Sequence, residues 1–239
     1  ERGIMKELLE QLLPLQEYEA LLSGFRQGKR LISVYGMSPI HRAHFAAALR
    51  QDLKKPILMV CRDEQQAAAL AADLRELCGA EPALLGSREF VFHHIENASR
   101  EYEHRRIHAL DAFRHARLPV MVATPEALMM ATLPPEALEK ASFTLKAEGD
   151  YSLEELRRVL VSAGYAPAQA VEGSGQFSVR GGILDIFPAG AQLPIRAEFF
   201  GDTVDSLGRF DPQSQRRLEN IKSVRILPAR ETLPQLCPG

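Results

Sequence analysis

Hydrophobic positions change their spacing a little past the middle of the chain. In the first part, short apolar runs alternate with segments whose apolar residues recur at the helical period. The predicted strands are 31–36, 57–61, 82–86 and 119–123, and the predicted helices are 4–25 (interrupted by Pro14), 40–53, 63–77, 99–113 and a short one after 123. Short apolar strands separated by helices predict a parallel sheet covered on both faces.

The second part begins after the helix-breaking pair Pro134-Pro135. One amphipathic helix is predicted at 152–165. The strand candidates that follow are closely spaced: 175–181, 182–190, 193–202, 203–211 and 223–229. Turn residues such as Gly201-Asp202 and Asp211-Pro212 separate them, which predicts hairpins in an antiparallel or mixed sheet. We therefore expect an α/β domain at 1–142, a small α+β domain at 143–230 and a tail at 231–239.

Composition narrows the class of protein without naming a function. The chain has 239 residues, 46% of them hydrophobic and 25% charged, with a net charge of −2. These are ordinary values for a globular protein, and they give no overall basic field for nucleic acid. The three cysteines are far apart and form no C-x-x-C pair, which favours a reducing, cytoplasmic setting. No apolar run is long enough to span a membrane, so we expect no membrane segment. The first residues, "ERGI", do not resemble a signal peptide. They also lack an initiator methionine, so we expect the chain to be a piece of a longer protein.

The turn after the first strand lies where a nucleotide-binding domain has its phosphate loop. Aligned on G-x-x-x-x-G-K-[ST] from Gly36, the chain has His41 at the second glycine, Arg42 at the lysine and Ala43 at the hydroxyl. Pro39 also removes one backbone N–H. Without the lysine and the metal-binding hydroxyl, we expect a degenerate loop that binds no cofactor and catalyses no ATP hydrolysis.

Other candidate sites in the first domain have structural interpretations. Asp63 and Glu64 end a strand as a metal-binding carboxylate would, but Asp63 is better placed to cap the next helix. His104 and His108 have the i, i+4 spacing of metal ligands, but Arg105 and Arg106 beside them oppose a cation. We predict a solvated helix face there, with weak DNA binding as the alternative. No convincing nucleophile–base set is present, and we predict neither a catalytic nor a metal site.

Strand alternation gives a sharper signal in the second domain. It puts Arg180, Arg196, Glu198 and Phe200 on one face. The opposite face, which would pack on the helix at 152–165, carries Phe177, Val179, Ile195, Ala197 and Phe199. An exposed phenylalanine between arginines is typical of a protein-binding hot spot. The alternative is that Phe200 is core and the arginines are solvated or salt-bridged.

The run "GQFSVRGGILDIFPAGAQLPIRAEFFGDTVDSLGRFDPQSQR", followed by "LPARE", resembles the bacterial transcription-repair coupling factors (Mfd). It is also similar to domain 2 of the excision-repair protein UvrB. The degenerate loop "GMSPIHRA" fits the UvrB-like amino-terminal module of this family. UvrB itself would carry an intact phosphate loop and a tyrosine-rich hairpin, which "REFVFHHIENASREYEHRR" does not provide.

The resemblance implies a helicase-like (RecA-like) half-domain, comparable to UvrB domain 1a, followed by a UvrA-binding domain 2. Under this resemblance, residues 231–239 are either a tail or the start of a domain 1b. The resemblance carries the family's recognition residues onto Arg180, Arg196 and Phe200, with Glu198 on the same face as a further candidate. The full-length proteins of this family are translocases that use ATP to move along DNA. The resemblance implies that the part present in this chain is not itself an enzyme. The motor, the RNA polymerase contact and an autoinhibitory carboxy-terminal domain lie in parts of the family beyond this chain.

The function expected from the sequence is therefore that of an adaptor, which recruits UvrA to lesions where RNA polymerase has stalled. Two alternatives remain open at this point. One is an ATP-dependent helicase half-domain of nucleotide excision repair, and the other is a weak DNA-binding module that uses the arginine-rich helix.

Overall fold

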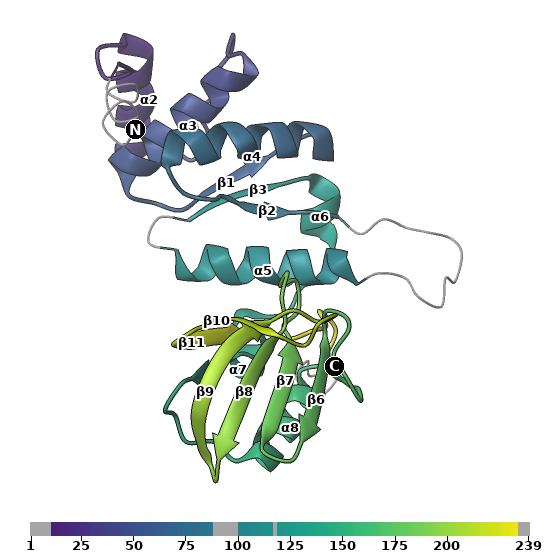
Figure 1. Ribbon diagram of the computed structural model, residues 1–239. Coiled ribbons are helices and arrows are strands. Elements are labelled where there is room, and N and C mark those ends of the chain that lie inside the picture. The colour runs from purple at the N-terminus through teal and green to yellow at the C-terminus, as the bar shows by residue number, and fades with distance from the viewer. Residues whose placement is uncertain (1–10, 88–99, 117–118, 234–239) are drawn as a thin grey trace. The chain divides into compact units, whose positions relative to one another are not determined.

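A three-stranded parallel sheet forms the centre of the first part of the computed structural model (Figure 1), which describes residues 11–87, 100–116 and 119–233. Its strands are β1 (Ile57–Val60), β2 (Ala83–Leu85) and β3 (Val120–Ala123), in the order β1-β3-β2. Both pairings are parallel. The prediction of a parallel sheet is confirmed for these strands.

Helices cover both faces of this sheet, as expected. Helices α3 (Pro39–Leu53) and α4 (Glu64–Cys78) bury small and aliphatic side chains against one face. The second half of α5 (Glu101–His115) packs Ala109, Leu110 and Phe113 near the other face. Helix α2 (Gln16–Arg26) packs on α3 around Tyr18, and the short α6 (Pro125–Met129) follows β3.

The strand expected at 31–36 does not form, and that prediction is wrong. Residues 31–35 have no regular secondary structure, and Leu31 and Tyr35 are 85% and 88% exposed. Apolar, β-branched sequence favours a strand only where a neighbouring strand supplies hydrogen-bond partners and a surface to pack on. In the described parts of the chain β1 pairs with β3 alone, so this segment has no ladder to join.

The second part is built on a mixed six-stranded sheet of order β10-β9-β8-β7-β6-β5. The bounds are β5 (Ala166–Pro167), β6 (Gln176–Arg180), β7 (Ile183–Phe187), β8 (Ile195–Phe200), β9 (Thr203–Phe210) and β10 (Arg217–Asn220). Within this sheet, β5 and β6 pair in parallel and the other described neighbours pair antiparallel. A separate antiparallel pair joins β4 (Phe143–Lys146) to β11 (Ser223–Ile226), and α7 (Pro135–Ala141) precedes β4. The prediction of hairpins in an antiparallel or mixed sheet is confirmed, and the sheet is of the mixed kind.

Helix α8 (Leu153–Ser162) covers one face of the six-stranded sheet (Figure 1). Ser152 caps it by accepting a hydrogen bond from the Glu155 N–H, which satisfies one free donor of the first turn. The core between helix and sheet contains Leu156, Leu160, Phe177, Leu184, Ile186, Ile195, Ala197, Val204 and Leu207. Val179 was predicted to join this core but is 37% exposed at the end of β6. Helix α8 does not cover the opposite face of β6–β9.

Contacts divide the chain into two compact units. Unit 1 comprises Glu1–Glu89 and Ala109–Met130, and unit 2 comprises Phe90–His108 and Ala131–Gly239. Strand β4 begins at Phe143, where the sequence placed the start of the second domain, but unit 2 also takes in earlier residues, including the first half of α5. Among the described residues, no helix is both long and apolar enough to cross a bilayer.

Candidate protein-binding site

A buried carboxylate organises the sheet face of unit 2 that α8 does not cover. Asp185 lies on the central strand β7, directly opposite Arg196 on β8. Its side chain is only 1% exposed, which isolated carboxylates avoid because of the loss of hydration. Two guanidinium groups compensate: Arg196 donates from Nε to Oδ1 at 2.7 Å and from Nη2 to Oδ2 at 2.8 Å, and Arg180 donates from Nη2 to Oδ2 at 2.8 Å. We call Arg180, Asp185, Arg196, Glu198 and Phe200 the arginine–phenylalanine face.

Arg196 is held on every side by unit 2 itself. Its guanidinium carbon lies 4.4 Å from the ring centroid of Phe210, in a cation–π contact. Its Nη2 also donates to Gln215 Oε1 at 2.8 Å. The hydrogen bonds to Asp185 raise the pKa of Arg196 above its ordinary value, although burial opposes them. With its side chain only 17% exposed, Arg196 is a fixed, fully charged part of the site.

Gln215 reaches Arg196 from the loop between β9 and β10. This residue has a left-handed backbone, with φ of 60°, which is uncommon for a residue with a side chain. The loop is held by the Gln215 N–H, which donates to the Asp211 carbonyl, and by the Ser214 N–H, which donates to Asp211 Oδ1. The strained residue is therefore fixed in place and presents its amide oxygen to the guanidinium.

Arg180 is more accessible than Arg196. It is the last residue of β6, before the turn at Gly181 and Gly182, and its side chain is 50% exposed. Gly181 has φ of +58°, and a side chain on Gly182 would lie 2.9 Å from the Phe199 carbonyl oxygen. The two glycines thus allow a tight hairpin beside β8. Arg180 retains water access and makes one charge-assisted hydrogen bond to Asp185.

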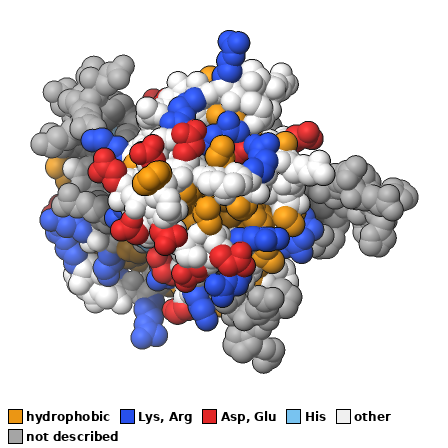
Figure 2. All heavy atoms as spheres, turned by 60° about the horizontal axis from the view of Figure 1, so that its bottom comes forward, with side chains coloured by type: hydrophobic (Ala, Val, Ile, Leu, Met, Phe, Trp, Pro, Cys, Tyr) orange, Lys and Arg blue, Asp and Glu red, His pale blue; other side chains and the backbone are white. Residues whose placement is uncertain are grey.

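Phe200 is the most exposed part of the face. It ends β8 and is 85% exposed, whereas its neighbour Phe199 packs against the core. Glu198 lies one alternation earlier and accepts a hydrogen bond from Ser206 at 2.7 Å. Arg217 pairs with Glu198 at 3.1 Å, so this acidic group is already neutralised by β10. Figure 2, turned to bring the bottom of Figure 1 forward, shows hydrophobic side chains among charged groups of both signs.

The structure brings the four predicted residues onto one face and adds others to them. The prediction weighed Phe200 as core against Phe200 as surface, and the side chain is exposed. The arginines are salt-bridged, as the alternative anticipated, but to a shared internal carboxylate. Sequence reasoning missed Asp185, although a single aspartate inside the apolar run "GILDIF" is a signal that a buried charge needs partners.

The degenerate loop in unit 1 lies beside a cavity of about 450 Å³. Gly36 has φ of +80°, and α3 begins at Pro39, so Arg42 falls in the first turn and Ala43 is fully buried. Arg42 lines the cavity with Arg62 and Asp63. Asp63 caps α4 by accepting from the Gln66 N–H at 2.8 Å, as predicted, and also accepts from Arg62. The carboxylate that resembled a metal ligand is therefore engaged in helix capping.

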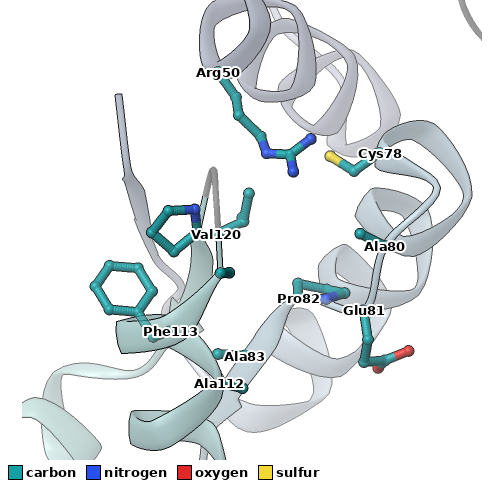
Figure 3. Close-up of a pocket in the computed structure, with 11 residues that line it drawn as sticks. Arg50, Cys78, Ala80, Glu81, Pro82, Ala83, Ala112, Phe113 and Val120 are labelled. Carbon is teal, nitrogen blue, oxygen red and sulfur yellow. The ribbon is translucent and has the colours of Figure 1, made fainter. Parts of the chain in front are cut away.

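A second cavity of unit 1, of about 260 Å³, opens at the amino-terminal ends of β2 and β3 (Figure 3). Phe113, Pro82 and Val120 make its wall largely apolar, and Arg50 reaches in beside Cys78. Burial raises the pKa of the Cys78 thiol, while Arg50 lowers it in part. A thiol with a raised pKa is a poor nucleophile, so this cavity presents an apolar recess with one cationic group.

The solvated face predicted for α5 is wrong. His104 is 4% exposed and Arg106 is 1% exposed. His104 Nε2 donates to the Ala229 carbonyl at 3.1 Å, and His108 Nε2 donates to the Ala189 carbonyl. Arg106 Nε lies 3.0 Å from both carboxylate oxygens of Glu231. The partners follow 81 to 125 residues later in the chain, so the pattern of this helix alone could not reveal them.

The same contacts weaken the DNA-binding alternative. Arg106 is buried in its ion pair, and the exposed Arg105 lies 4.0 Å from Glu101 one turn away. A cationic strip along α5 would need both guanidinium groups facing solvent. The described part of this helix does not offer that strip.

Acidification is expected to lower the stability of unit 2 through His104. Burial lowers the pKa of His104 below its ordinary value, and the hydrogen bond to Ala229 opposes this only in part. The unfolded chain then binds more protons than the folded chain between the two pKa values. The contribution of His104 is therefore complete above about pH 6.5 and is lost as the pH falls through the lower, folded pKa. Urea denaturation from about pH 7.5 to about pH 5 measures this loss.

The matched variant for this experiment is His104→Gln, whose amide can still donate to Ala229. Burial raises the pKa of Glu231, so that group favours the folded state as the pH falls and opposes His104. Since both proteins contain Glu231, its effect cancels in their difference. The stability advantage of the wild type should shrink with acid, and an advantage that is constant with pH contradicts the prediction.

Comparison with known proteins gives the sequence its family. The model of the UvrB interaction domain matches residues 143–231, which span the mixed sheet and α8. A transcription-repair-coupling factor of Myxococcus xanthus is 34% identical over 90% of this chain, and one of Bacillus subtilis is 32% identical over 91%. The chain is homologous to the amino-terminal region of transcription-repair-coupling factors. The factor of Escherichia coli is 30% identical over 74% of the chain.

The chain spans about a fifth of the length of these coupling factors, from 15% of the Escherichia coli protein to 19% of the Myxococcus xanthus protein. The resemblance drawn from the strand run of the second domain is thereby confirmed at the level of the family. The arginine–phenylalanine face lies wholly inside the segment matched by the domain model. This placement makes it the strongest candidate for a binding site in the described structure.

Proposed function

We propose that this chain is the adaptor region of a transcription-coupled repair factor, and that its arginine–phenylalanine face binds UvrA. One observation carries the proposal. A large aromatic side chain, Phe200, is 85% exposed next to a rigid, doubly hydrogen-bonded arginine network. Exposed aromatic residues beside ordered arginines are the groups that dominate binding energy in protein interfaces.

Geometry and charge favour a protein partner with an acidic group near an apolar pocket. Phe200 offers a ring to fill such a pocket, and Arg180 offers a half-exposed guanidinium for a carboxylate. The internal hydrogen bonds fix Arg196 before binding, so the face loses little side-chain entropy at this position when the partner arrives. Glu198, already paired with Arg217, sets a limit on where a second acidic group can approach.

Family membership supplies the biological setting of the proposal. In this reading, the chain brings UvrA to a polymerase stalled at a lesion. RNA polymerase contact, ATP-driven movement along DNA and autoinhibition by a carboxy-terminal domain belong to other parts of the coupling factor. The ATP-binding alternative is less well supported, because His41, Arg42 and Ala43 replace the groups that hold phosphate and metal.

Binding to purified UvrA tests the proposal directly. The variant Arg180→Ala/Arg196→Ala/Phe200→Ala should abolish capture of the chain by immobilised UvrA. The matched control is Arg157→Ala/Arg158→Ala/Val161→Ala, which removes two exposed arginines and one exposed apolar residue from α8, on the other side of the sheet. The control should bind like the wild type. If the two triple variants bind UvrA equally well, the arginine–phenylalanine face is not the binding site. If the wild type does not bind UvrA, UvrA is not the partner.

A further inference from the structure

The two arginines of the arginine–phenylalanine face play unequal parts in holding Asp185. Arg196 makes two of the three guanidinium hydrogen bonds to this carboxylate, one to each oxygen, at 2.7 and 2.8 Å. Arg180 makes the third, at 2.8 Å, to the oxygen that Arg196 Nη2 already contacts. A planar guanidinium matches a carboxylate in this two-point manner, so the pair with Arg196 is sufficient by itself.

Arg180 and Arg196 also differ in the exposure of their side chains to solvent. The Arg180 side chain is 50% exposed and pairs with Asp185 alone among the described residues, whereas the Arg196 side chain is 17% exposed. Arg196 is further fixed by the Phe210 ring and by Gln215. Moving Arg196 toward a partner would break its contacts with strands β7 and β9 and with the β9–β10 loop. It would also leave Asp185 with a single guanidinium hydrogen bond. Moving Arg180 breaks only one bond of the three.

We propose that Arg196 is a positioning residue, and that it makes Arg180 exchangeable. This inference rests on the proposed function. Because Arg196 keeps the buried Asp185 charge paired, Arg180 can leave Asp185 and bind a carboxylate of the partner without stranding a charge. Arg180 and Phe200 touch the partner, and Arg196 acts through Asp185.

The register of the strands gives the spacing that the partner must match. Arg180 on β6 and Glu198 on β8 are both paired with Ile183 of β7, so they lie in one row across three strands. Phe200 lies two residues further along β8. With strands ~4.8 Å apart and a rise of ~3.4 Å per residue, the Cα atoms of Arg180 and Phe200 are roughly 12 Å apart. The partner surface should therefore present a carboxylate and an apolar pocket at about this separation.

Removing Arg196 gives an outcome that separates positioning from contact. In Arg196→Met, whose stem can still cover Phe210, Asp185 is left with Arg180 as its remaining guanidinium. Releasing Arg180 would then leave a buried charge unpaired, so Arg180 stays on Asp185 and is withheld from the partner. Affinity for UvrA should fall by about tenfold or more, although the proposal gives Arg196 no contact with UvrA.

Removing the carboxylate as well should restore binding. In Arg196→Met/Asp185→Asn no buried charge holds Arg180, and affinity should return to within about threefold of Asp185→Asn alone. If Arg196 itself contacts UvrA, the double variant is as weak as Arg196→Met or weaker, and the proposal is overturned. Arg209→Met, which removes an arginine that pairs with Glu219 elsewhere on the sheet, is the control for the loss of a positive charge.

Association rates give a readout that a purely structural role would not move. An exposed arginine steers an acidic partner, so Arg180→Met should slow association and flatten its dependence on salt. Arg196→Met should show the same flattened salt dependence, and the double variant should recover the wild-type dependence. Recovery of affinity without recovery of the salt dependence overturns the exchange of Arg180.

Loss of the fold and failure of the proposed function are both distinguishable from failure of this inference. Hydrogen exchange of the β7 and β8 amides shows whether each variant is folded, and Asp185→Leu, an apolar replacement, is used if Asp185→Asn is not. The proposed function fails if the wild type does not bind UvrA, or if Arg180→Met and Phe200→Ala both bind like the wild type. The inference fails when those variants behave as proposed but no Asp185 replacement rescues Arg196→Met.

Discussion

Replacing Phe200 with alanine should weaken binding of the chain to UvrA by at least about 2 kcal/mol, which is roughly 30-fold in Kd. The ring is 85% exposed at the end of β8, so it stabilises little within the chain and is available to a partner. An aromatic anchor that fills an apolar pocket loses most of its buried area when truncated. Biolayer interferometry of the variant against immobilised UvrA measures the change.

Val161→Ala is the matched control for this experiment. Val161 is an apolar residue of α8 that is 53% exposed, on the helix that covers the other face of the sheet. Its truncation should leave the affinity for UvrA unchanged, and neither substitution should alter the stability of unit 2 by more than about 0.5 kcal/mol. A Phe200→Ala protein that binds as tightly as Val161→Ala would show that the ring is not the anchor.

Replacing Arg106 with alanine should destabilise unit 2 by about 3–5 kcal/mol. The side chains of Arg106 and Glu231 are 1% and 7% exposed, and the substitution leaves the Glu231 carboxylate buried without its guanidinium. Burial already raises the pKa of Glu231, and Arg106 is what opposes this rise. Since protonation removes the unpaired charge, the penalty should be smaller at about pH 5 than at about pH 8.

The adjacent Arg105 provides the control for this helix. Its side chain is 71% exposed and lies 4.0 Å from Glu101, a surface pair that contributes little. Arg105→Ala should change stability by less than about 0.5 kcal/mol. Hydrogen exchange of the β7 and β8 amides reports unit 2 separately, which a global melting curve of a two-unit chain does not. Equal exchange in the two variants would contradict a buried ion pair.

Local pattern was a good guide wherever an element buries one of its own faces. The sequence predicted both helix α4, from its helical period, and the cap at Asp63. The cap is predictable because the first N–H groups of a helix need a nearby acceptor. Strand alternation placed Arg180 and Phe200 on one face for a similar reason. The strand predicted from Leu31 to Tyr35 does not form, because a strand needs a neighbouring strand to pair with. The described part of the chain provides no such neighbour for this segment.

Buried polar contacts were the other failure of prediction. The sequence of α5 is rich in histidine and arginine, which usually indicates a solvated helix. Arg106 is nevertheless among the most buried side chains, because Glu231 approaches it from a segment 125 residues away. Asp185 is similar, since its burial depends on two arginines that other strands supply. The pairing that makes burial of a charge possible involves two residues, and the local sequence around one of them does not reveal the other.

By itself, the sequence predicted a parallel sheet followed by an antiparallel or mixed one, the degenerate phosphate loop and the face that carries Arg180, Arg196, Glu198 and Phe200. These follow from periodicity and from which atoms each side chain has. Only the tertiary structure decided that Asp185 lies beneath both arginines, that Arg196 is enclosed while Arg180 is half exposed, and that α5 is joined to the 229–231 segment. The physical reason is that burial and charge pairing depend on distances between residues far apart in the chain, which chain folding alone sets.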